Sequence, residues 1–267
     1  MSTDGTTMMD APCVLASGGM DSFLAWRLFR PDAINVFIDI RQPYAGKESN
    51  ALAAIKTAYE RTAKPLAPPF ITMSLSGGPF GRDPMPSGII LHRNALLILA
   101  AARLFNDITM GVLADEINSD KSPEFLSAME TVLNISHRGQ YWNGGHGVTY
   151  NISTPTRDYT KSELVAEYLA QGHPTEPLLA TVSCYADDSH GKQCGACPSC
   201  FKRWVALTNN GLPGSFTGNP ARWGVDNGIL RKAMDGTYGE RRANEIKQAY
   251  QKAGYDVHEI AVGWVKP

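Results

Sequence analysis

Four cysteines lie close together in the sequence, and their spacing suits a metal ion. The pattern is C-x9-C-x2-C-x2-C, and the residues are Cys184, Cys194, Cys197 and Cys200. Four thiolates fit tetrahedral Zn²⁺ and leave no open coordination position, so such a site is structural. The same ligands could hold an iron–sulfur cluster, but the spacing differs from the bacterial ferredoxin run, and the remote fourth ligand favours zinc. We therefore expect one structural zinc ion.

A second segment has the composition of a phosphate-binding loop. SGGMDS, from Ser17 to Ser22, stands between an apolar run at 13–17 and a segment of helical spacing at 23–29. Two glycines let the backbone turn sharply, and free N–H groups at a helix start favour an anion. The serine hydroxyls can donate to phosphate, whereas Asp21 beside phosphate implies a bridging Mg²⁺. No Gly-Lys-Ser/Thr follows, which excludes a Walker A loop. The alternative is an ordinary capped glycine turn.

The elements that must position these residues alternate between strand and helix. Strands are expected at 13–17, 33–40, 69–75, 107–114 and 148–155, and helices at 23–29, 48–63, 92–105, 122–136 and 160–172. Ser122 with Pro123, and Thr160 with Gly172, are start and stop signals for the last two helices. This alternation predicts an α/β fold, with a doubly wound parallel sheet covered by helices on both faces.

Composition limits the classes of protein that fit. The chain has 267 residues, 43% hydrophobic and 19% charged, with a formal net charge of -1. A neutral chain has no general attraction to nucleic acid or anionic membrane. No apolar run is long enough to span a bilayer, and the N-terminus has no secretory signal. We expect a cytoplasmic protein, with residues 1–10 as a flexible leader and the fifth cysteine, Cys13, as a small buried strand residue.

The C-terminal segment has a different character. Residues 212–220 are too rich in Gly and Pro for a helix or central strand, and one helix is expected at 239–254 before an apolar end at 260–265. No nucleophile, metal cluster or phosphate loop stands there. The expected division is therefore a nucleotide domain at 11–182, a zinc segment at 183–211 and an extension at 212–267. We interpret the extension as a recognition element for a protein partner, or as packing on the zinc lobe.

Several motifs together resemble a known family. SGGMDS resembles the pyrophosphate loop of the N-type ATP pyrophosphatases, which belong to the adenine nucleotide α-hydrolase fold. The cysteine segment, SCY followed by CGACPSCFKR, resembles more narrowly the zinc segment of the 7-cyano-7-deazaguanine synthase family. VFIDIRQ, HRNALLILAAA, GVLADE and TPTRDYTKSELV resemble further segments of that family in the matching order. The resemblance runs from about Cys13 to Val205.

The resemblance implies functional residues. It implies catalytic roles for Asp21, Arg93 and Lys161, with Lys161 offsetting charge on departing pyrophosphate. The implied ATP-binding residues are Ser17, Gly18, Gly19, Met20, Asp21, Ser22, Asp39 and Gln42. The implied substrate-binding residues are Asn94, Asp115, Glu116 and Phe125.

The resemblance also implies a reaction. ATP adenylates the carboxylate of 7-carboxy-7-deazaguanine, ammonia displaces AMP to give an amide, and a second ATP-driven step gives the nitrile. Zn²⁺, Mg²⁺ and ATP are the implied cofactors and cosubstrate, and a homodimer is the implied assembly.

Three features depart from the family pattern. The base-recognition loop is shorter at Glu116–Phe125, Ile40 and Arg41 replace an aromatic residue and a glycine, and about sixty residues follow the zinc segment. These departures leave an alternative open. In that alternative, the enzyme belongs to a phage or antiviral defence system, and it stops at the amide or transfers the activated acyl group to an amine on a macromolecule.

Overall fold

The computed structural model describes residues 11–62, 70–75, 90–116, 119–139, 145–184 and 193–257. The expected leader, the Gly/Pro-rich segment from Ser76 to Gly88 and the apolar end at 260–265 lie outside these ranges. The chain forms two compact units. One comprises Met1–Asp158 and Glu176–Thr181, and the other comprises Tyr159–Thr175 and Val182–Pro267.

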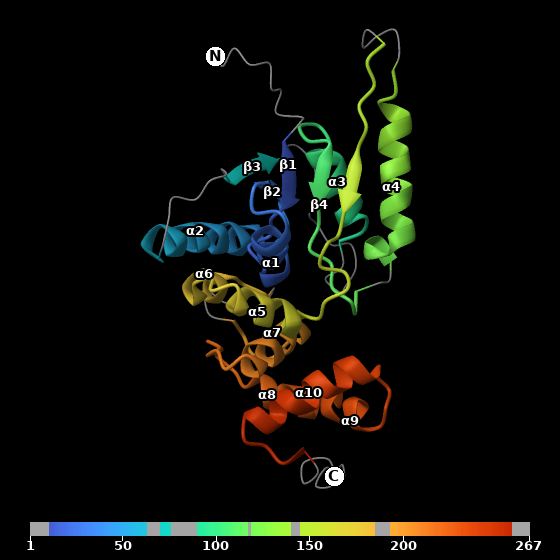
Figure 1. Ribbon diagram of the computed structural model, residues 1–267. Helices are drawn as coiled ribbons and strands as arrows, with labels where there is room; N and C mark the ends of the chain where they lie inside the picture. Colours follow the sequence, from blue (N-terminus) through green and yellow to red (C-terminus); the bar gives the residue numbers. More distant parts are fainter. Residues whose placement is uncertain are drawn as a thin grey trace. The chain divides into compact units, whose positions relative to one another are not determined.

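The first unit is built on a parallel five-stranded sheet (Figure 1). Its strands are β1 (Pro12–Leu15), β2 (Ile34–Asp39), β3 (Phe70–Ser74), β4 (Asp107–Thr109) and β5 (Asn151–Ser153). They run in the order β3-β2-β1-β4-β5, and every pair is parallel. The expected doubly wound α/β fold is therefore confirmed. The order reverses between β1 and β4, and this is where such sheets bind ligands.

Helices cover both faces of this sheet. They are α1 (Met20–Phe29), α2 (Ala45–Thr62), α3 (Arg93–Ala101) and α4 (Pro123–Ser136). Alternate residues of β1 and β2, among them Cys13 and Val36, form one core with α3 and α4. On α1 and α2, Trp26 packs edge-on against Tyr59 and against Phe70 of β3. Cys13 is fully buried as expected, and burial raises the pKa of its thiol to about 12.

Two expected helix starts are confirmed. Ser122 precedes α4, and its side chain accepts a hydrogen bond from the Phe125 backbone N–H. Thr160 precedes α5 (Lys161–Ala170) and forms a reciprocal capping box with Glu163. Ser119–Lys121 is a short 3₁₀ turn ahead of α4, and α6 (Thr175–Ala180) follows α5.

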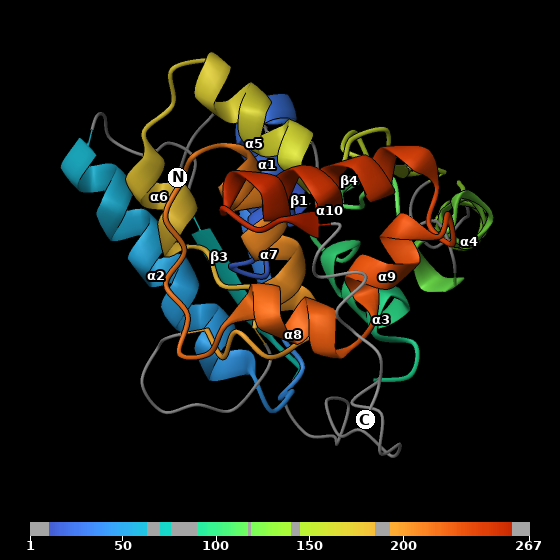
Figure 2. The same cartoon turned by 90° about the horizontal axis from the view of Figure 1, so that it is seen from below.

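The second unit is helical, and its last helices share one core. They are α7 (Pro198–Asn209), α8 (Pro220–Asp226), α9 (Ile229–Met234) and α10 (Glu240–Lys252). Phe201 of α7 and Tyr250 of α10 lie in this core, and Trp204 packs edge-on against Tyr250. Helices α8 and α10 pack against α7, and α9 packs against α8 and α10 (Figure 2). Helix α5 lies within the nucleotide domain expected at 11–182, but it packs against α7 in this unit.

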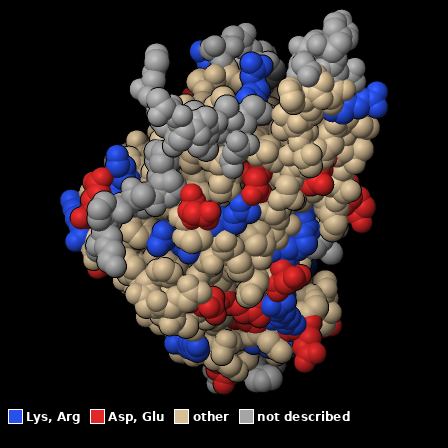
Figure 3. All heavy atoms as spheres, turned by 45° about the horizontal axis from the view of Figure 1, so that its top comes forward, with Lys and Arg blue, Asp and Glu red and all other residues tan. Residues whose placement is uncertain are grey.

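The expectation of a single helix after Leu212 is wrong, because α8 and α9 precede α10. The signal for α8 was present, since Asn219 caps the helix through a bond from Arg222 N–H and Pro220 occupies its first turn. The Gly- and Pro-rich composition of residues 212–220 led to the expectation that no helix begins there. The described helices include none with the length and apolar character needed to cross a bilayer. On the face in Figure 3, basic and acidic side chains are interspersed.

Candidate nucleotide site and metal site

The glycine-rich loop follows β1 and leads into α1, as expected. Its serines close the loop on itself: the Ser17 backbone N–H donates to Ser22 Oγ at 3.3 Å, and Ser22 Oγ donates to the Gly19 carbonyl at 3.2 Å. The cap position of α1 is Gly19, which has no side chain to bond the N–H groups of the first turn. Those N–H groups therefore suit an anion. Met20 is buried, so its contribution to a ligand would come from its backbone.

Two glycines allow the close approaches around this loop. Gly18 has φ +68°, and a Cβ there would lie 2.7 Å from the Glu48 carbonyl oxygen of α2. A Cβ on Gly111, just beyond β4, would lie 2.7 Å from the backbone of Asp21. The ends of β1 and β4 and the starts of α1 and α2 thus meet at the point where the sheet order reverses.

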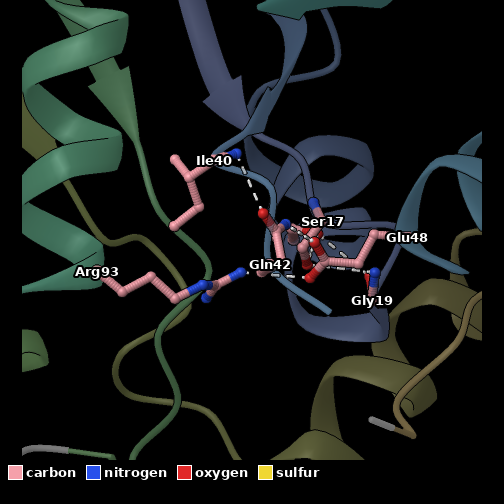
Figure 4. Close-up of polar contacts among 7 residues, drawn as sticks. Ser17, Gly19, Ile40, Gln42, Glu48 and Arg93 are labelled. Carbon is pink, nitrogen blue, oxygen red and sulfur yellow. Dashed lines mark hydrogen bonds and ion pairs between the residues drawn. The ribbon is translucent and has the colours of Figure 1, made fainter. Parts of the chain in front are cut away.

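A buried polar network lies beside the loop (Figure 4). Gln42 is 4% exposed, and its Oε1 accepts a bond of 3.1 Å from the Ile40 backbone N–H. Gln42 Nε2 donates to Glu48 Oε2 at 2.6 Å. Arg93 reaches the same carboxylate from the start of α3, with 3.3 Å between NH2 and Oε1. Gln42, one of the predicted ATP-binding residues, therefore already has protein hydrogen-bond partners for both its amide oxygen and its amide nitrogen.

Glu48 is the residue of this network that was not predicted from the sequence. It is 7% exposed, and its burial raises the pKa of its carboxyl, while the Arg93 charge and the Gln42 hydrogen bond act in the opposite direction. A sequence signal existed, since a Glu in the first turn of α2 faces inward with Ala51 and Ile55 at helical spacing. This signal could be assigned to the site only with the knowledge that Arg93 lies next to Glu48 in the fold.

Asp39 and Arg41 lie at the carboxyl end of β2. Asp39 Oδ1 accepts a hydrogen bond of 2.6 Å from the Arg41 backbone N–H. Arg41 has φ 60°, a left-handed conformation that glycine adopts without strain. Arg41 therefore adopts a backbone conformation that favours the glycine expected there from the family resemblance.

The predicted substrate residues cluster around the 3₁₀ turn before α4. Asn94 is buried, and its Nδ2 donates to the Asp120 carbonyl at 3.3 Å. Lys121 Nζ bonds Glu116 Oε2 at 2.9 Å. Phe125 packs partly buried against the main core of the first unit, whereas Asp115 is exposed. Ile117 and Asn118 lie outside the described residues.

Lys161 occupies the first position of α5, directly after the Thr160 cap. It belongs to the second unit, whereas the glycine-rich loop belongs to the first. Its role at departing pyrophosphate stays a prediction.

The four cysteines of the sequence motif come together in the second unit. Their sulfur atoms all lie within 4.8 Å of one another, and Cys194 Sγ and Cys200 Sγ are 3.8 Å apart. Two thiolates on a tetrahedral zinc ion would be separated by about 3.8 Å, given Zn–S bonds of about 2.3 Å. Backbone N–H groups of Cys194, Ala196 and Cys200 point at sulfur atoms of the cluster at 3.3 to 3.4 Å. The cluster could therefore hold zinc.

The electrostatics of the cluster favour a thiolate. A hydrogen bond from the Cys200 side chain lowers the pKa of Cys197 to about 5 and correspondingly raises that of Cys200. Metal binding would deprotonate the remaining thiols. The local fold supports the geometry: Gly195 has φ +69°, and Cys197 caps α7, with Pro198 in the first turn.

The chain is an α/β protein with a glycine-rich loop at the switch point of a parallel sheet, and with a four-cysteine cluster that could hold a metal ion. The family model of the queuosine biosynthesis protein QueC matches residues 73–211. The chain therefore belongs to the QueC family, as a divergent member.

Individual relatives agree with this assignment at modest identity. A 7-cyano-7-deazaguanine synthase from Xanthomonas euvesicatoria pv. vesicatoria is 27% identical over 222 residues, which are 77% of this chain and 96% of that protein. Its namesake from Hydrogenovibrio crunogenus is 33% identical over 138 residues, 49% of this chain and 56% of that protein. One from Pseudomonas syringae pv. tomato is 32% identical over 108 residues, 40% and 45% of the two chains.

Proposed function

We propose that this protein uses ATP to activate the carboxylate of 7-carboxy-7-deazaguanine, that ammonia displaces AMP to give the amide, and that a second ATP-driven step dehydrates the amide to the nitrile, 7-cyano-7-deazaguanine. AMP and pyrophosphate leave in each activating step, which makes the enzyme an ATP-dependent ligase that forms a carbon–nitrogen bond. Membership of the QueC family, with relatives named as the synthase of this nitrile, carries the proposal. The glycine-rich loop at the switch point, which leads into a helix start without a side-chain cap, supports the binding of ATP.

The chemistry needs an electrophile and a way to spread negative charge. A carboxylate resists attack by ammonia, whereas an acyl-AMP does not. The residues suited to hold the phosphates are Ser17, Gly18, Gly19, Asp21 and Ser22, with Asp21 as a ligand for Mg²⁺. Mg²⁺ would supply neutralisation of phosphate charge when bound. Arg93 and Lys161 are the basic residues that we assign to the neutralisation of phosphate charge.

The carboxylate-bearing base is assigned to the segment around the 3₁₀ turn. Glu116 or Asp115 can accept from the N–H edge of a guanine-like base, since a carboxylate matches a pair of donors. Asn94 and Phe125 border the same segment. The Lys121–Glu116 ion pair would have to rearrange for Glu116 to take this role.

Zinc is proposed to hold the cysteine lobe together without entering the reaction, because four thiolates leave no open position. The homodimer suggested by the family resemblance is part of the same proposal.

The experiment is incubation with ATP, Mg²⁺, 7-carboxy-7-deazaguanine and ammonium, followed by mass spectrometry of all products. The expected products are AMP, pyrophosphate and the nitrile. If no deazaguanine product forms and calorimetry detects no binding of the base, with or without an ATP analogue, the proposed substrate is wrong.

A second candidate is transfer of the activated acyl group to an amine on a protein or other macromolecule, or arrest at the amide. The helices α8–α10 favour keeping it, because they lie beyond residue 211, where the family match ends. The same incubation distinguishes the candidates: an amide without nitrile, or a mass increase on a protein, would replace the nitrile product.

A further inference from the structure

The buried carboxylate of Glu48 connects three segments of the candidate nucleotide site. Its side chain accepts from Gln42 in the loop after β2 and from Arg93 at the start of α3. Its backbone carbonyl lies against Gly18, where no side chain could fit. Figure 4 shows Arg93 extending from α3 toward Glu48, while Gln42 approaches from the β2 loop. One residue of α2 thus contacts the glycine loop, the β2 loop and the start of α3.

Glu48 and Arg93 differ in solvent exposure, and this difference suggests which of the two can contact a ligand. The Glu48 side chain is 8% exposed and the Arg93 side chain 22%. Burying a carboxylate costs free energy unless hydrogen bonds and an opposite charge compensate it. Arg93 supplies that charge, also lies 5.7 Å above the Tyr44 ring, and keeps a partly accessible guanidinium. Glu48 is too enclosed to contact a ligand itself, but it can fix the direction of an arginine that does.

We propose that Glu48 is a positioning residue that holds the Arg93 guanidinium and the Gln42 amide in the geometry required for nucleotide phosphates. This inference rests on the proposed ATP-dependent function. It assigns the phosphate contact to Arg93 and the orientation of that contact to Glu48. Glu48 therefore acts on ATP only through its neighbours.

The test is a double-mutant cycle read by nucleotide affinity. The variants are Glu48→Gln, Arg93→Gln and their combination, and the probe is α,β-methylene-ATP with Mg²⁺, measured by calorimetry. Glu48→Gln keeps the shape and removes the charge that orients Arg93. We expect each single variant to weaken the Kd by about tenfold, and the double variant to be no weaker than Arg93→Gln alone, since coupled residues are not additive.

A matched control removes a carboxylate from the same helix. Glu60 is exposed and forms a long ion pair with Lys56 of α2, at 4.0 Å. Glu60→Gln should bind the analogue like the wild type. A merely structural role for Glu48 would lower the unfolding temperature and leave the Kd of the folded variant unchanged, which would overturn the proposal. Additive losses in the double variant would overturn it as well.

The same variants remain informative if Glu48→Gln does not fold, and the wild type separates this inference from the proposed function. If Glu48→Gln alone does not fold, the double variant, which leaves no unpaired buried charge, is compared with Arg93→Gln. Equal affinities support the proposal, and a further tenfold loss overturns it. A wild type that binds the analogue but makes no deazaguanine product would refute the proposed function and leave this inference standing. A wild type that does not bind the analogue would refute both.

Discussion

Gly18 illustrates how a single residue sets the shape of the candidate site. Its backbone is left-handed, and the space where a Cβ would project is filled by the Glu48 carbonyl and the Ala51 side chain. The left-handed conformation costs an L-residue about 1–2 kcal/mol before any clash is counted. Gly18 therefore lets the loop and α2 approach each other closely.

We predict that Gly18→Ala lowers the free energy of unfolding by more than about 2 kcal/mol and abolishes tight nucleotide binding, because both conformation and space oppose a methyl group. Gly46→Ala in α2 is the control. A Cβ at Gly46 would meet no atom within 4 Å, so this change should be neutral or stabilising by up to about 1 kcal/mol. Denaturant unfolding monitored by circular dichroism measures both. Equal stability of the two variants would contradict this account.

Asp21 is predicted to act chemically. Asp21→Ala should reduce the rate of pyrophosphate release on the order of 100-fold, since it removes the group expected to hold Mg²⁺ near the phosphates. The unfolding temperature should stay close to that of the wild type. Asp32→Ala, an exposed carboxylate in the turn after α1, should keep full activity. If Asp21→Ala releases pyrophosphate at the wild-type rate, the metal-binding role is excluded.

The sequence predicted local chemistry better than long-range contacts. The glycine loop and the cysteine cluster could be read because each motif is nearly contiguous and its residue types have few other uses. Glu48 could not be assigned, because its partners Gln42 and Arg93 are 6 and 45 residues away and only the fold unites them. Gln42 could be recognised, but its burial could not.

The four-cysteine cluster of the second unit could hold a zinc ion. We predict that purified protein contains one zinc ion per chain and that Cys200→Ser loses it, with a loss of helical signal in the second unit, because metal-binding free energy contributes to folding. Cys13→Ala removes a buried thiol outside the cluster and should keep the zinc content. Elemental analysis of both variants decides. An iron–sulfur absorbance in the wild type would contradict the zinc assignment.

The C-terminal helix α10 packs against α7 and forms a side-chain contact with α5. Arg241 of α10 donates to Glu163 of α5, with 2.8 Å between Nε and Oε1. Burial opposes ionisation of Glu163, but hydrogen bonds from Arg241 and Thr160 outweigh it and lower the pKa of the carboxyl. This exposed pair adds little by itself. The shared core around Phe201 and Tyr250 provides the main attachment.

A truncation that ends at Gly211 should therefore destabilise the second unit, because it uncovers Phe201 and Val205, which are 3% and 6% exposed. Circular dichroism and zinc content are the measurements. As a control within the same helices, Arg222→Ala removes an exposed ion pair with Asp226 and should change the unfolding free energy by less than about 0.5 kcal/mol. A truncated protein that folds, activates the base and fails only in transfer to a partner would instead support the predicted recognition element.

At the scale of elements, periodicity identified every strand of the described sheet and the helices α1 to α5 and α10, but it did not identify α7, which lies in the cysteine segment. It failed for the short helices α6, α8 and α9, because six or seven residues do not establish a period of 3.6. The strand expected at 107–114 ends at Thr109, and just beyond it Gly111 brings the chain close to Asp21 at the site. Hydrophobicity alone would extend this strand past the point where the chain turns toward the site.

For the whole molecule, we propose that ATP activates a carboxylate oxygen of a deazaguanine. The loop at the switch point of the sheet and membership of the QueC family together support this proposal. Activation by adenylation leaves a chemical record, because the AMP that departs keeps the oxygen through which it was attached. Conversion to the amide releases one such oxygen, and conversion of the amide to the nitrile releases the other.

The most direct measurement uses 7-carboxy-7-deazaguanine labelled with ¹⁸O at both carboxylate oxygens, with ATP, Mg²⁺ and ammonium, and mass spectrometry of AMP. The account predicts AMP carrying one ¹⁸O atom, with two labelled AMP molecules for each nitrile formed. One labelled AMP for each acyl group would indicate arrest at the amide or transfer to another amine. Unlabelled AMP, or ADP and phosphate in place of AMP and pyrophosphate, would contradict carboxylate adenylation.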